Sequence, residues 1–318
     1  MFDRQPTAQT NGPRLDEVGE FLTTRHDKEV TDLELLHGGF WSAAYGYRVD
    51  DRGLVLRLGQ NSEWFEIDRA AMAHNGPDLP VPEVLEIGEA FGGAYAVSVR
   101  HYGRFLEAVT PHEADIVGPT IVRFLTALKA APSQPTSSSW RDWLMRGLID
   151  DPNSPQHGWR TTLADDPALD SLFRSCESRV GELAASCPER GDLVHGDLLH
   201  SNVLVSEDAS RVNAVFSWKC SKRGDFLFDV AWCTFCGGAF HPGIGAADVF
   251  GRIVTAPSIT ADPRALTDAA ERHHCYELHI GATSLGWNIW VGNEQALRAV
   301  ADYTAEILKR GPLAAGNR

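Results

Sequence analysis

The most informative stretch of this chain is Leu193-Val-His-Gly-Asp-Leu-Leu-His-Ser-Asn-Val-Leu-Val205. Its two ends are short apolar runs typical of strands, and the polar loop between them contains Asp197 and Asn202. A carboxylate in such a loop can accept a proton from a hydroxyl, and a carboxamide oxygen can ligate a hard cation such as Mg²⁺. The alternative is an Asx-rich turn without function. The strands on both sides, and His195-Gly196 directly before the aspartate, favour the functional interpretation.

Upstream of this loop, the sequence from residue 33 to residue 99 favours short strands. A helical pattern from Asp68 to His74 ends at Asn75-Gly-Pro77. One helix among about five strands predicts a small antiparallel sheet. The predicted strands are Leu33–Leu36, Trp41–Val49, Leu54–Leu58, Glu83–Ile87 and Ala94–Val99.

Downstream of about residue 104 the chain is predicted to be mostly helical. Ile121, Phe124, Leu125 and Leu128 have helical spacing, and a second helix is expected to begin at Asp166-Pro167. Residues 270–291 and 294–309 also have helical patterns, and the Ser/Pro stretch 132–139 is expected to be a loop. The run Ala214–Trp218 has strand character.

Composition limits the classes of partner. The 318 residues include 29 Lys and Arg against 43 Asp and Glu, a net charge of −14. Such a chain repels nucleic-acid backbones and anionic membranes and attracts cations, so neither nucleic acid nor membrane is expected as a partner. The six cysteines form no disulfide framework. No secretory signal or apolar stretch of about 18 residues is found, and the expected location is the cytoplasm.

The loop from His195 to Asn202 resembles the H-G-D-x-x-x-x-N catalytic loop of the aminoglycoside phosphotransferase and choline kinase-like family, small-molecule relatives of protein kinases. The resemblance extends over most of residues 33–310 and is strongest to hygromycin B phosphotransferase-like proteins. The segments that carry it are Leu54-Val-Leu-Arg-Leu58, Leu79-Pro-Val-Pro-Glu-Val-Leu-Glu-Ile-Gly88, Trp140-Arg-Asp-Trp143 and Gly224-Asp-Phe-Leu-Phe-Asp-Val-Ala231.

The resemblance implies an α+β, bilobal protein kinase-like fold. Residues 1–14 are then a loose tail, and residues 15–100 form a small, mainly antiparallel β N-lobe that binds nucleotide. Residues 101–318 form a larger, mostly helical C-lobe with the catalytic loop and the substrate-binding helices.

The resemblance also implies roles for single residues. Asp197 is the expected catalytic base and Asn202 a Mg²⁺ ligand. Arg57 occupies the place of the phosphate-contacting lysine of the kinase fold, with Asp68 as its expected ion-pair partner and Glu66 as the rival. The residues expected to bind the nucleotide are Gly38, Gly39 and Ser42 in a phosphate loop, Arg57, Asp68, the hinge Ser98, Val99 and Arg100, and Lys219.

Ser217 is the largest departure from the family pattern. The family has a metal-binding Asp in an I-D-W-like strand, whereas this chain reads Val215-Phe-Ser-Trp218. A neutral hydroxyl at this metal position is a weak Mg²⁺ ligand beside a carboxylate. Because residues two apart on a strand face one side, Lys219 is expected to share the face of Ser217 and to supply the missing positive charge. The alternative is that Lys219 extends into solvent.

Other polar and thiol groups receive structural interpretations. Of Asp225 and Asp229, one is expected to cap a helix, and the resemblance gives Asp229 the task of bracing the catalytic loop. Cys233 and Cys236 are interpreted as packed thiols, and the pair His273-His274 as surface or packing residues.

Two functions follow from the sequence, and a third, a thiol redox enzyme that uses Cys233 and Cys236, is weaker because these cysteines lack a thioredoxin-like βαβ context. The first is an ATP-dependent O-phosphotransferase, with Mg²⁺, that acts on a small, hydroxylated, cationic molecule of the aminoglycoside or aminocyclitol type, such as hygromycin B. The second is a non-catalytic pseudokinase of the same fold that lost its metal-binding Asp. GTP in place of ATP, the acceptor hydroxyl and the oligomeric state stay open.

Overall fold

The computed structural model describes residues 12–36, 41–133 and 139–313, and these fall into two compact units. The described part of residues 6–105, together with His200–Cys220, is called the sheet unit. The described residues of Leu106–Leu199 and Ser221–Arg318 are called the helical unit. The predicted division at residue 100 stays a prediction, and the packing assigns His200–Cys220 to the sheet rather than to the helices.

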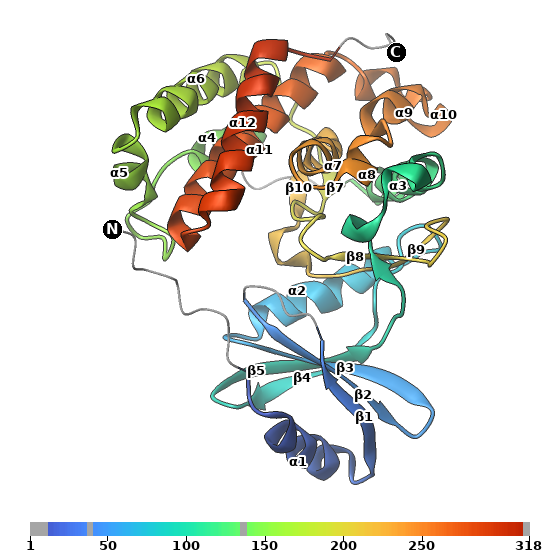
Figure 1. The fold of residues 1–318 in the computed structure, drawn as a ribbon. Coiled ribbons are helices and arrows are strands. Elements are labelled where there is room, and N and C mark those ends of the chain that lie inside the picture. The colour runs from blue at the N-terminus through green and yellow to red at the C-terminus, as the bar shows by residue number, and fades with distance from the viewer. Residues whose placement is uncertain (1–11, 37–40, 134–138, 314–318) are drawn as a thin grey trace. The chain divides into compact units, whose positions relative to one another are not determined.

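The sheet unit is built on a five-stranded antiparallel sheet with the order β1-β2-β3-β5-β4, as the sequence predicted (Figure 1). A second sheet joins β6, β8 and β9, all antiparallel. The elements are α1 (Leu15–His26), β1 (Val30–Leu35), β2 (Ala43–Val49), β3 (Arg52–Gly59), α2 (Glu63–Ala71), η1 (Met72–His74), β4 (Val84–Ala90), β5 (Gly93–Val99), β6 (Arg104–Phe105), β8 (Val203–Val205), β9 (Val212–Val215) and η4 (Trp218–Cys220).

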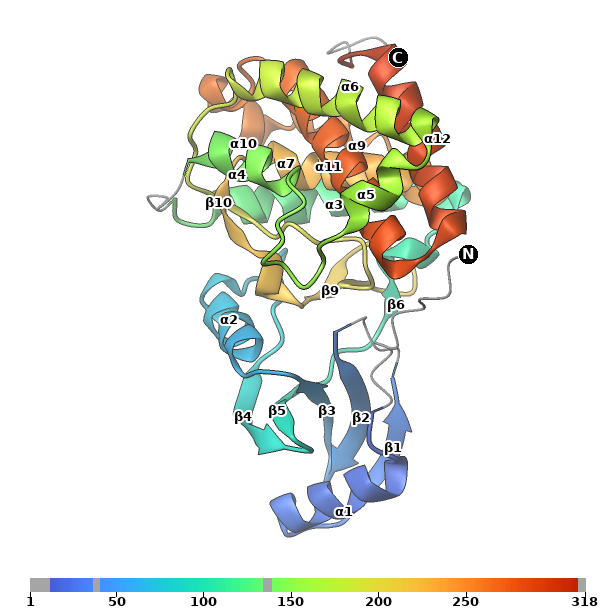
Figure 2. The ribbon, with the colours of Figure 1, turned by 90° about the vertical axis from the view of Figure 1, so that its left-hand side faces the viewer.

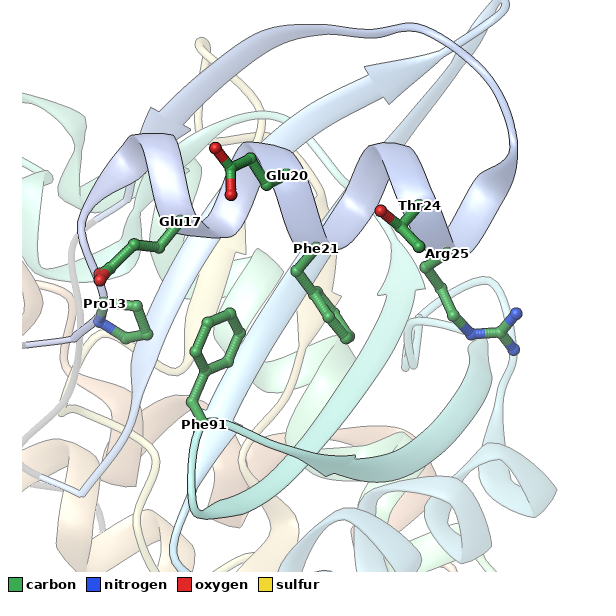
Figure 3. A pocket seen from close by; sticks show the side chains of 7 residues that line it. All are labelled: Pro13, Glu17, Glu20, Phe21, Thr24, Arg25 and Phe91. Atoms are coloured by element: carbon green, nitrogen blue, oxygen red, sulfur yellow. The ribbon is translucent and has the colours of Figure 1, made fainter.

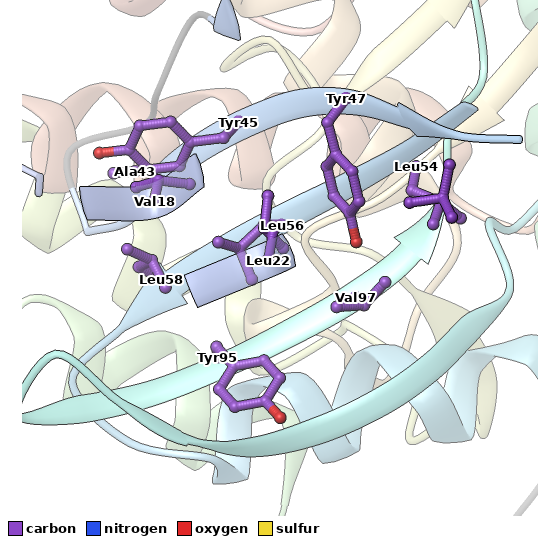
Figure 4. Close-up of a cluster of buried hydrophobic side chains, with 11 residues drawn as sticks. Val18, Leu22, Ala43, Tyr45, Tyr47, Leu54, Leu56, Leu58, Tyr95 and Val97 are labelled. Carbon is purple, nitrogen blue, oxygen red and sulfur yellow. The ribbon is translucent and has the colours of Figure 1, made fainter. Parts of the chain in front are cut away.

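Helix α1 covers one face of the five-stranded sheet. Every second side chain of β2 points toward that face, and Val18 and Leu22 of α1 pack against these side chains. Tyr45 and Tyr47 of β2 are almost fully buried there (Figure 4). Alternation along β2 therefore builds the core, as the sequence predicted. The prediction of a single helix among the strands is wrong, because α1 is a second one. Its short apolar stripe and acidic first turn are the helix signals that the prediction did not use.

An open concavity of about 780 Å³ lies on the sheet unit, between α1 and the β4–β5 turn (Figure 3). Phe21 of α1 and Phe91 of the turn contact edge to face there, with ring centroids 5.3 Å apart. None of the predicted site residues lines this concavity. It is therefore not the candidate site.

The helical unit is arranged around the long helix α11, which contacts α5, α6, α7 and α12 (Figures 1 and 2). Because α11 is buried on most of its circumference, it lacks the single apolar stripe of a surface helix. The elements are η2 (Leu106–Ala108), η3 (Pro111–Glu113), α3 (Ala114–Ala130), α4 (Trp140–Gly147), α5 (Trp159–Ala164), α6 (Pro167–Ala184), β7 (Asp192–Val194), β10 (Lys222–Gly224), α7 (Leu227–Ala239), α8 (Pro242–Gly245), α9 (Val249–Thr255), α10 (Pro257–Thr260), η5 (Pro263–Ala265), α11 (Ala269–Val291) and α12 (Glu294–Arg310).

Local sequence signals explain several helix boundaries. The Asp166 carboxylate accepts hydrogen bonds from the main-chain N–H groups of Ala168 and Leu169, so α6 begins where the sequence predicted. The predicted helices 270–291 and 294–309 correspond to α11 and α12. The predicted loop 132–139 lies largely outside the described residues. Among the described residues, no helix combines the length and the apolar character needed to cross a membrane.

A buried ion pair joins α11 to the segment before α7. The Arg272 guanidinium donates to both carboxylate oxygens of Asp225, at 2.7 and 2.8 Å, and the Tyr276 hydroxyl donates to Asp225 at 2.7 Å. Arg272 also donates to the carbonyl oxygens of Ala265 and Thr267. Asp225 also accepts a hydrogen bond from the Leu227 N–H at 3.2 Å, but its main partner is Arg272. The residue at the N-cap of α7 is Phe226, which makes no side-chain cap, so the expectation that Asp225 or Asp229 caps this helix is wrong.

The two adjacent histidines of α11, His273 and His274, are buried, so the surface alternative for them is wrong and the packing alternative is confirmed. Cys233 and Cys236 are buried free thiols, as predicted. Glu277, also on α11, is fully buried and paired with Arg310. It belongs to the core of the helical unit.

His279 makes the stability of the helical unit sensitive to acid. Burial, with a smaller effect of Lys222, lowers the pKa of His279 to about 3. The unfolded chain takes up this proton near pH 6.5 and the folded chain does not, so stability is lost as the pH falls from 6.5 toward 3. At pH 5 the loss is about 2 kcal/mol. Urea unfolding at pH 7.5 and pH 5 should show it.

The His279→Phe variant should lose about 2 kcal/mol less stability than the wild-type chain at pH 5, because phenylalanine takes up no proton. Phenylalanine should fit this position, since the His279 ring packs against the aromatic side chains of Trp143 and Phe228. The exposed His157 serves as control, and His157→Asn should lose the same stability as the wild-type chain. If His279→Phe loses as much stability between pH 7.5 and pH 5 as the wild-type chain does, His279 is not a source of the acid sensitivity.

Candidate functional site

The turn that carries Asp197 is held by a buried carboxylate. Asp229 of α7 accepts hydrogen bonds from the main-chain N–H groups of His195, at 2.7 Å, and Gly196, at 2.9 Å. Gly196 has a φ of +76°, a conformation that glycine adopts without strain. The bracing task expected of Asp229 is therefore confirmed. Two N–H donors on one carboxylate fix the main chain immediately before Asp197.

The electrostatics of this turn are set by burial. Burial raises the pKa of Asp229, and the positive potential of His195 and the two main-chain donors oppose that shift. Asp197 itself is only half-buried, and its main-chain N–H contacts the His195 ring at 3.3 Å. The turn thus presents the Asp197 carboxylate on the helical unit, on a main chain that cannot shift without breaking buried hydrogen bonds.

Asn202 and Ser217 lie at the same end of the β8–β9 hairpin, in the sheet unit. Val203 pairs with Val215, and the Phe216 N–H donates to the Asn202 carbonyl at 3.0 Å. Ser217 follows directly with a φ of +66°. The hairpin therefore brings together the two residues that were predicted to face a metal.

The predicted placement of Lys219 by strand alternation is wrong. Strand β9 ends at Val215, and Lys219 lies in the 3₁₀ turn η4, so residues 217 and 219 do not share a strand face. The left-handed conformation at Ser217 ends the strand pattern, and the apolar run Ala214–Trp218 gave no sign of this.

Arg57 and Asp68 form the ion pair that the sequence predicted. Arg57 extends from β3 to the buried carboxylate of Asp68 on α2, whereas the rival Glu66 pairs with Arg69 on the helix surface. The second oxygen of Asp68 accepts the Trp218 N–H at 2.6 Å. One carboxylate thus ties β3, α2 and the segment after Ser217 together.

The ammonium group of Lys219 lies over two indole rings. Its Nζ is 5.1 Å from the ring centroid of Trp41 and 5.1 Å from that of Trp64, within the range of a cation–π contact. The two rings meet edge to face, with centroids 6.1 Å apart. No side-chain role in the site was predicted for either tryptophan. The alternative that Lys219 extends into solvent is wrong, since the side chain is half-buried against these rings.

The remaining nucleotide residues are placed as follows. Gly38 and Gly39 lie outside the described residues, and Ser42 directly precedes β2. Ser98 and Val99 end β5, where the Val99 N–H donates to Glu83, and the Arg100 N–H donates to Gly53. Because these two N–H groups already have partners, adenine recognition at this hinge would have to use carbonyl oxygens. The predicted hinge role stays a prediction.

The donors available for Mg²⁺ do not match the arrangement expected from the family. In the sheet unit they are the amide of Asn202 and the hydroxyl of Ser217, without a carboxylate at the second position. Within the described ranges, no group of three or more His, Cys, Asp or Glu side chains could hold a metal ion. Oxygen donors suit Mg²⁺, but a protein site for it normally includes at least one carboxylate.

Two features together define a kinase-like phosphotransferase fold. The first is an antiparallel sheet in which Arg57 of β3 pairs with Asp68 of α2. The second is an H-G-D turn whose main chain is held by the buried Asp229. The chain belongs to the phosphotransferase enzyme family APH, whose profile matches residues 32–257. It is 32% identical over 232 residues to hygromycin-B 4-O-kinase from Escherichia coli. This alignment covers 67% of the chain and 64% of that relative, just under two thirds of its length.

Solved structures agree with this membership. Aminoglycoside phosphotransferase APH(4)-Ia is 25% identical with a TM-score of 0.77, over 94% of this chain and 100% of that one. A thermostable mutant of it, in ternary complex with AMP-PNP and hygromycin B, has a TM-score of 0.74 at 25% identity, over 92% and 98%. The GDP complex of aminoglycoside 2'-phosphotransferase-IIIa is 14% identical with a TM-score of 0.62, over 94% and 99%, and shares the fold alone. The predicted fold class and family are confirmed.

Proposed function

We propose that this protein is an ATP-dependent O-phosphotransferase that modifies a hydroxyl group of an aminoglycoside or aminocyclitol antibiotic such as hygromycin B. The observation that carries the proposal is the H-G-D turn, with Asp229 fixing the main chain before Asp197. Its support is the 32% identity to hygromycin-B 4-O-kinase and the likeness to a structure that holds AMP-PNP and hygromycin B.

In the proposed reaction, Asp197 accepts the proton of the acceptor hydroxyl and orients its oxygen toward the γ-phosphorus. Phosphoryl transfer depends mainly on positioning and charge neutralisation, so few protein groups are needed. Arg57, oriented by Asp68, would neutralise phosphate charge with a planar fork of donors. The segment Gly38–Ser42 would complete the phosphate site through its main-chain N–H groups.

The proposed cofactors are ATP, with GTP as the alternative, and Mg²⁺. Relatives in solved structures hold AMP-PNP, ADP or GDP. Asn202 is the residue that would contact Mg²⁺, which when bound neutralises phosphate charge. The neutral Ser217 gives the metal little further support, so no catalytic step is assigned to it.

The proposed acceptor is a cationic small molecule, since a chain with a net charge of −14 attracts polycations. The same charge opposes nucleic acid and anionic membranes as partners, and we propose action in the cytoplasm. Ser217 supports one other function, a pseudokinase that binds nucleotide or antibiotic without turnover.

A phosphorylation assay separates the two functions. Purified wild-type chain and Ser217→Asp are each incubated with Mg²⁺, hygromycin B and either ATP or GTP, and phosphorylated antibiotic is measured by mass spectrometry. Asp tolerates the left-handed conformation found at Ser217, so the variant should fold. Product from the wild-type chain supports the phosphotransferase. Product from Ser217→Asp alone supports the pseudokinase.

A further inference from the structure

Two buried thiols lie where α6 packs on α11. Cys275 belongs to α11, and Cys187 lies in the loop between the end of α6 and β7. The Cys187 thiol donates to the Leu183 carbonyl at 3.7 Å, and the Cys275 thiol donates to the Val180 carbonyl at 3.9 Å. Residues three apart share one side of a helix, so both sulfur atoms lie against the last two turns of α6.

The two thiols are also neighbours of each other. A hydrogen-bonding contact with the Cys275 thiol lowers the pKa of Cys187, against the opposing effect of burial. The same contact, together with burial, raises the pKa of Cys275. Cys187 is therefore the member of the pair that forms a thiolate more readily, and a second thiol lies beside it. This is the arrangement of an attacking cysteine and a resolving cysteine.

The two thiols differ in their access to solvent. Cys187 is 8% exposed, and Ser186 and Glu189 on either side of it are exposed, whereas Cys275 is fully buried. A small oxidant that arrives from solvent therefore meets Cys187 first. Cys275 is reached only through Cys187.

The other two neighbouring thiols of the helical unit are less suited to form a bond. Cys233 and Cys236 are three residues apart on α7. The Cβ atoms of such residues are about 5–6 Å apart, whereas a disulfide needs about 3.5–4.5 Å. A bond between them would distort the helix, but Cys187 and Cys275 come from a loop and a separate helix and have no such constraint.

We propose that Cys187 and Cys275 are a site of reversible oxidation, at which a peroxide forms a disulfide that stabilises the helical unit. The Cys187 thiolate attacks a peroxide oxygen, so that an S–O bond forms, the O–O bond breaks, and the departing hydroxide takes up the thiol proton to leave as water. The Cys275 sulfur then attacks the sulfenic sulfur. The S–S bond forms, and the S–OH group leaves as water with the Cys275 proton.

The balance of this sequence is simple. Two thiols lose two electrons and two protons, and one hydrogen peroxide becomes two waters. A dithiol reductant reverses the change by thiol–disulfide exchange. No nucleotide or antibiotic takes part, so the inference does not depend on the proposed phosphotransferase function.

The stabilising effect follows from chain entropy. A bond between positions 187 and 275 closes a loop of about 90 residues in the unfolded chain, and long loops gain most from such a constraint. The two thiols are already neighbours in the reduced fold, so the folded chain needs little rearrangement. The melting temperature should rise by about 5–10 °C on oxidation.

The test uses the full wild-type chain. It is treated with hydrogen peroxide, alkylated with iodoacetamide and digested without reductant. Mass spectrometry should find a peptide that links Cys187 to Cys275, and differential scanning fluorimetry should show the rise in melting temperature. Dithiothreitol should reverse both changes.

Three variants identify the order of the steps. Cys275→Ser should form no linked peptide, and its Cys187 should stop at the sulfenic acid, which dimedone labels. Cys187→Ser should give neither the linked peptide nor a dimedone label at Cys275. The control is Cys233→Ser, which changes a buried thiol of α7 and should form the disulfide as the wild-type chain does.

Two results overturn the inference, and both are measured on the wild-type chain, whatever the stability of the variants. The first is the absence of the linked peptide from folded chain after oxidation, including its appearance only in urea. The second is a linked chain that melts no higher than the reduced chain, since the bond would then strain the fold rather than stabilise it.

Discussion

Replacing Asp197 with asparagine is expected to lower kcat for the proposed phosphorylation of the antibiotic by about 10²–10⁴-fold. Asparagine has the same shape but cannot accept the hydroxyl proton. The turn should stay intact, because Asp229 holds it through main-chain groups of His195 and Gly196. Initial rates at saturating ATP and hygromycin B give kcat, and thermal unfolding shows whether the fold is unchanged.

A matched control is Glu207→Gln, which also removes one carboxylate charge but on the exposed β8–β9 turn. It should keep wild-type kcat. If Asp197→Asn retains more than a tenth of the activity, the carboxylate is not the base. An Asp197→Asn variant that binds ATP normally but does not turn over would further separate chemistry from nucleotide binding.

Replacing Arg272 with methionine is expected to destabilise the helical unit by about 3–5 kcal/mol. The substitution leaves the Asp225 carboxylate buried without its cation, and a buried unpaired charge is costly. It also removes the hydrogen bonds to Ala265 and Thr267. Urea unfolding at pH 7.5 measures the change in free energy.

The double variant Asp225→Leu with Arg272→Met should recover much of this loss, because two apolar side chains of similar size remove both buried charges together. Arg298→Met serves as control, since Arg298 forms an exposed pair with Glu294 on α12 and should cost little. A loss below about 1 kcal/mol in Arg272→Met would show that water or another cation reaches Asp225.

Much of the fold could be predicted from patterns within short segments. Alternation in Trp41–Val49 and the Asp166-Pro167 start of α6 each depend on neighbours in sequence, and the structure confirms both. Helix α1 was missed because its apolar stripe is short and its mean hydropathy is low. The predicted ion pair between Arg57 and Asp68 depended on the family resemblance, and the structure contains it.

The residues of the candidate site could be predicted only where they belong to a known sequence motif. The contact of Asp68 with the Trp218 N–H joins residues that are 150 positions apart, and no local sequence pattern predicts it. The same holds for Trp41, Trp64 and Lys219, which three separate segments bring together. Strand alternation failed at Lys219, because one residue with positive φ ended the strand before it.

The double use of the Asp68 carboxylate makes two events inseparable. Replacing Asp68 would remove the ion pair of Arg57 and the hydrogen bond of the Trp218 N–H in a single substitution. One carboxylate therefore couples the position of the Arg57 guanidinium on β3 to the position of the main chain at Trp218.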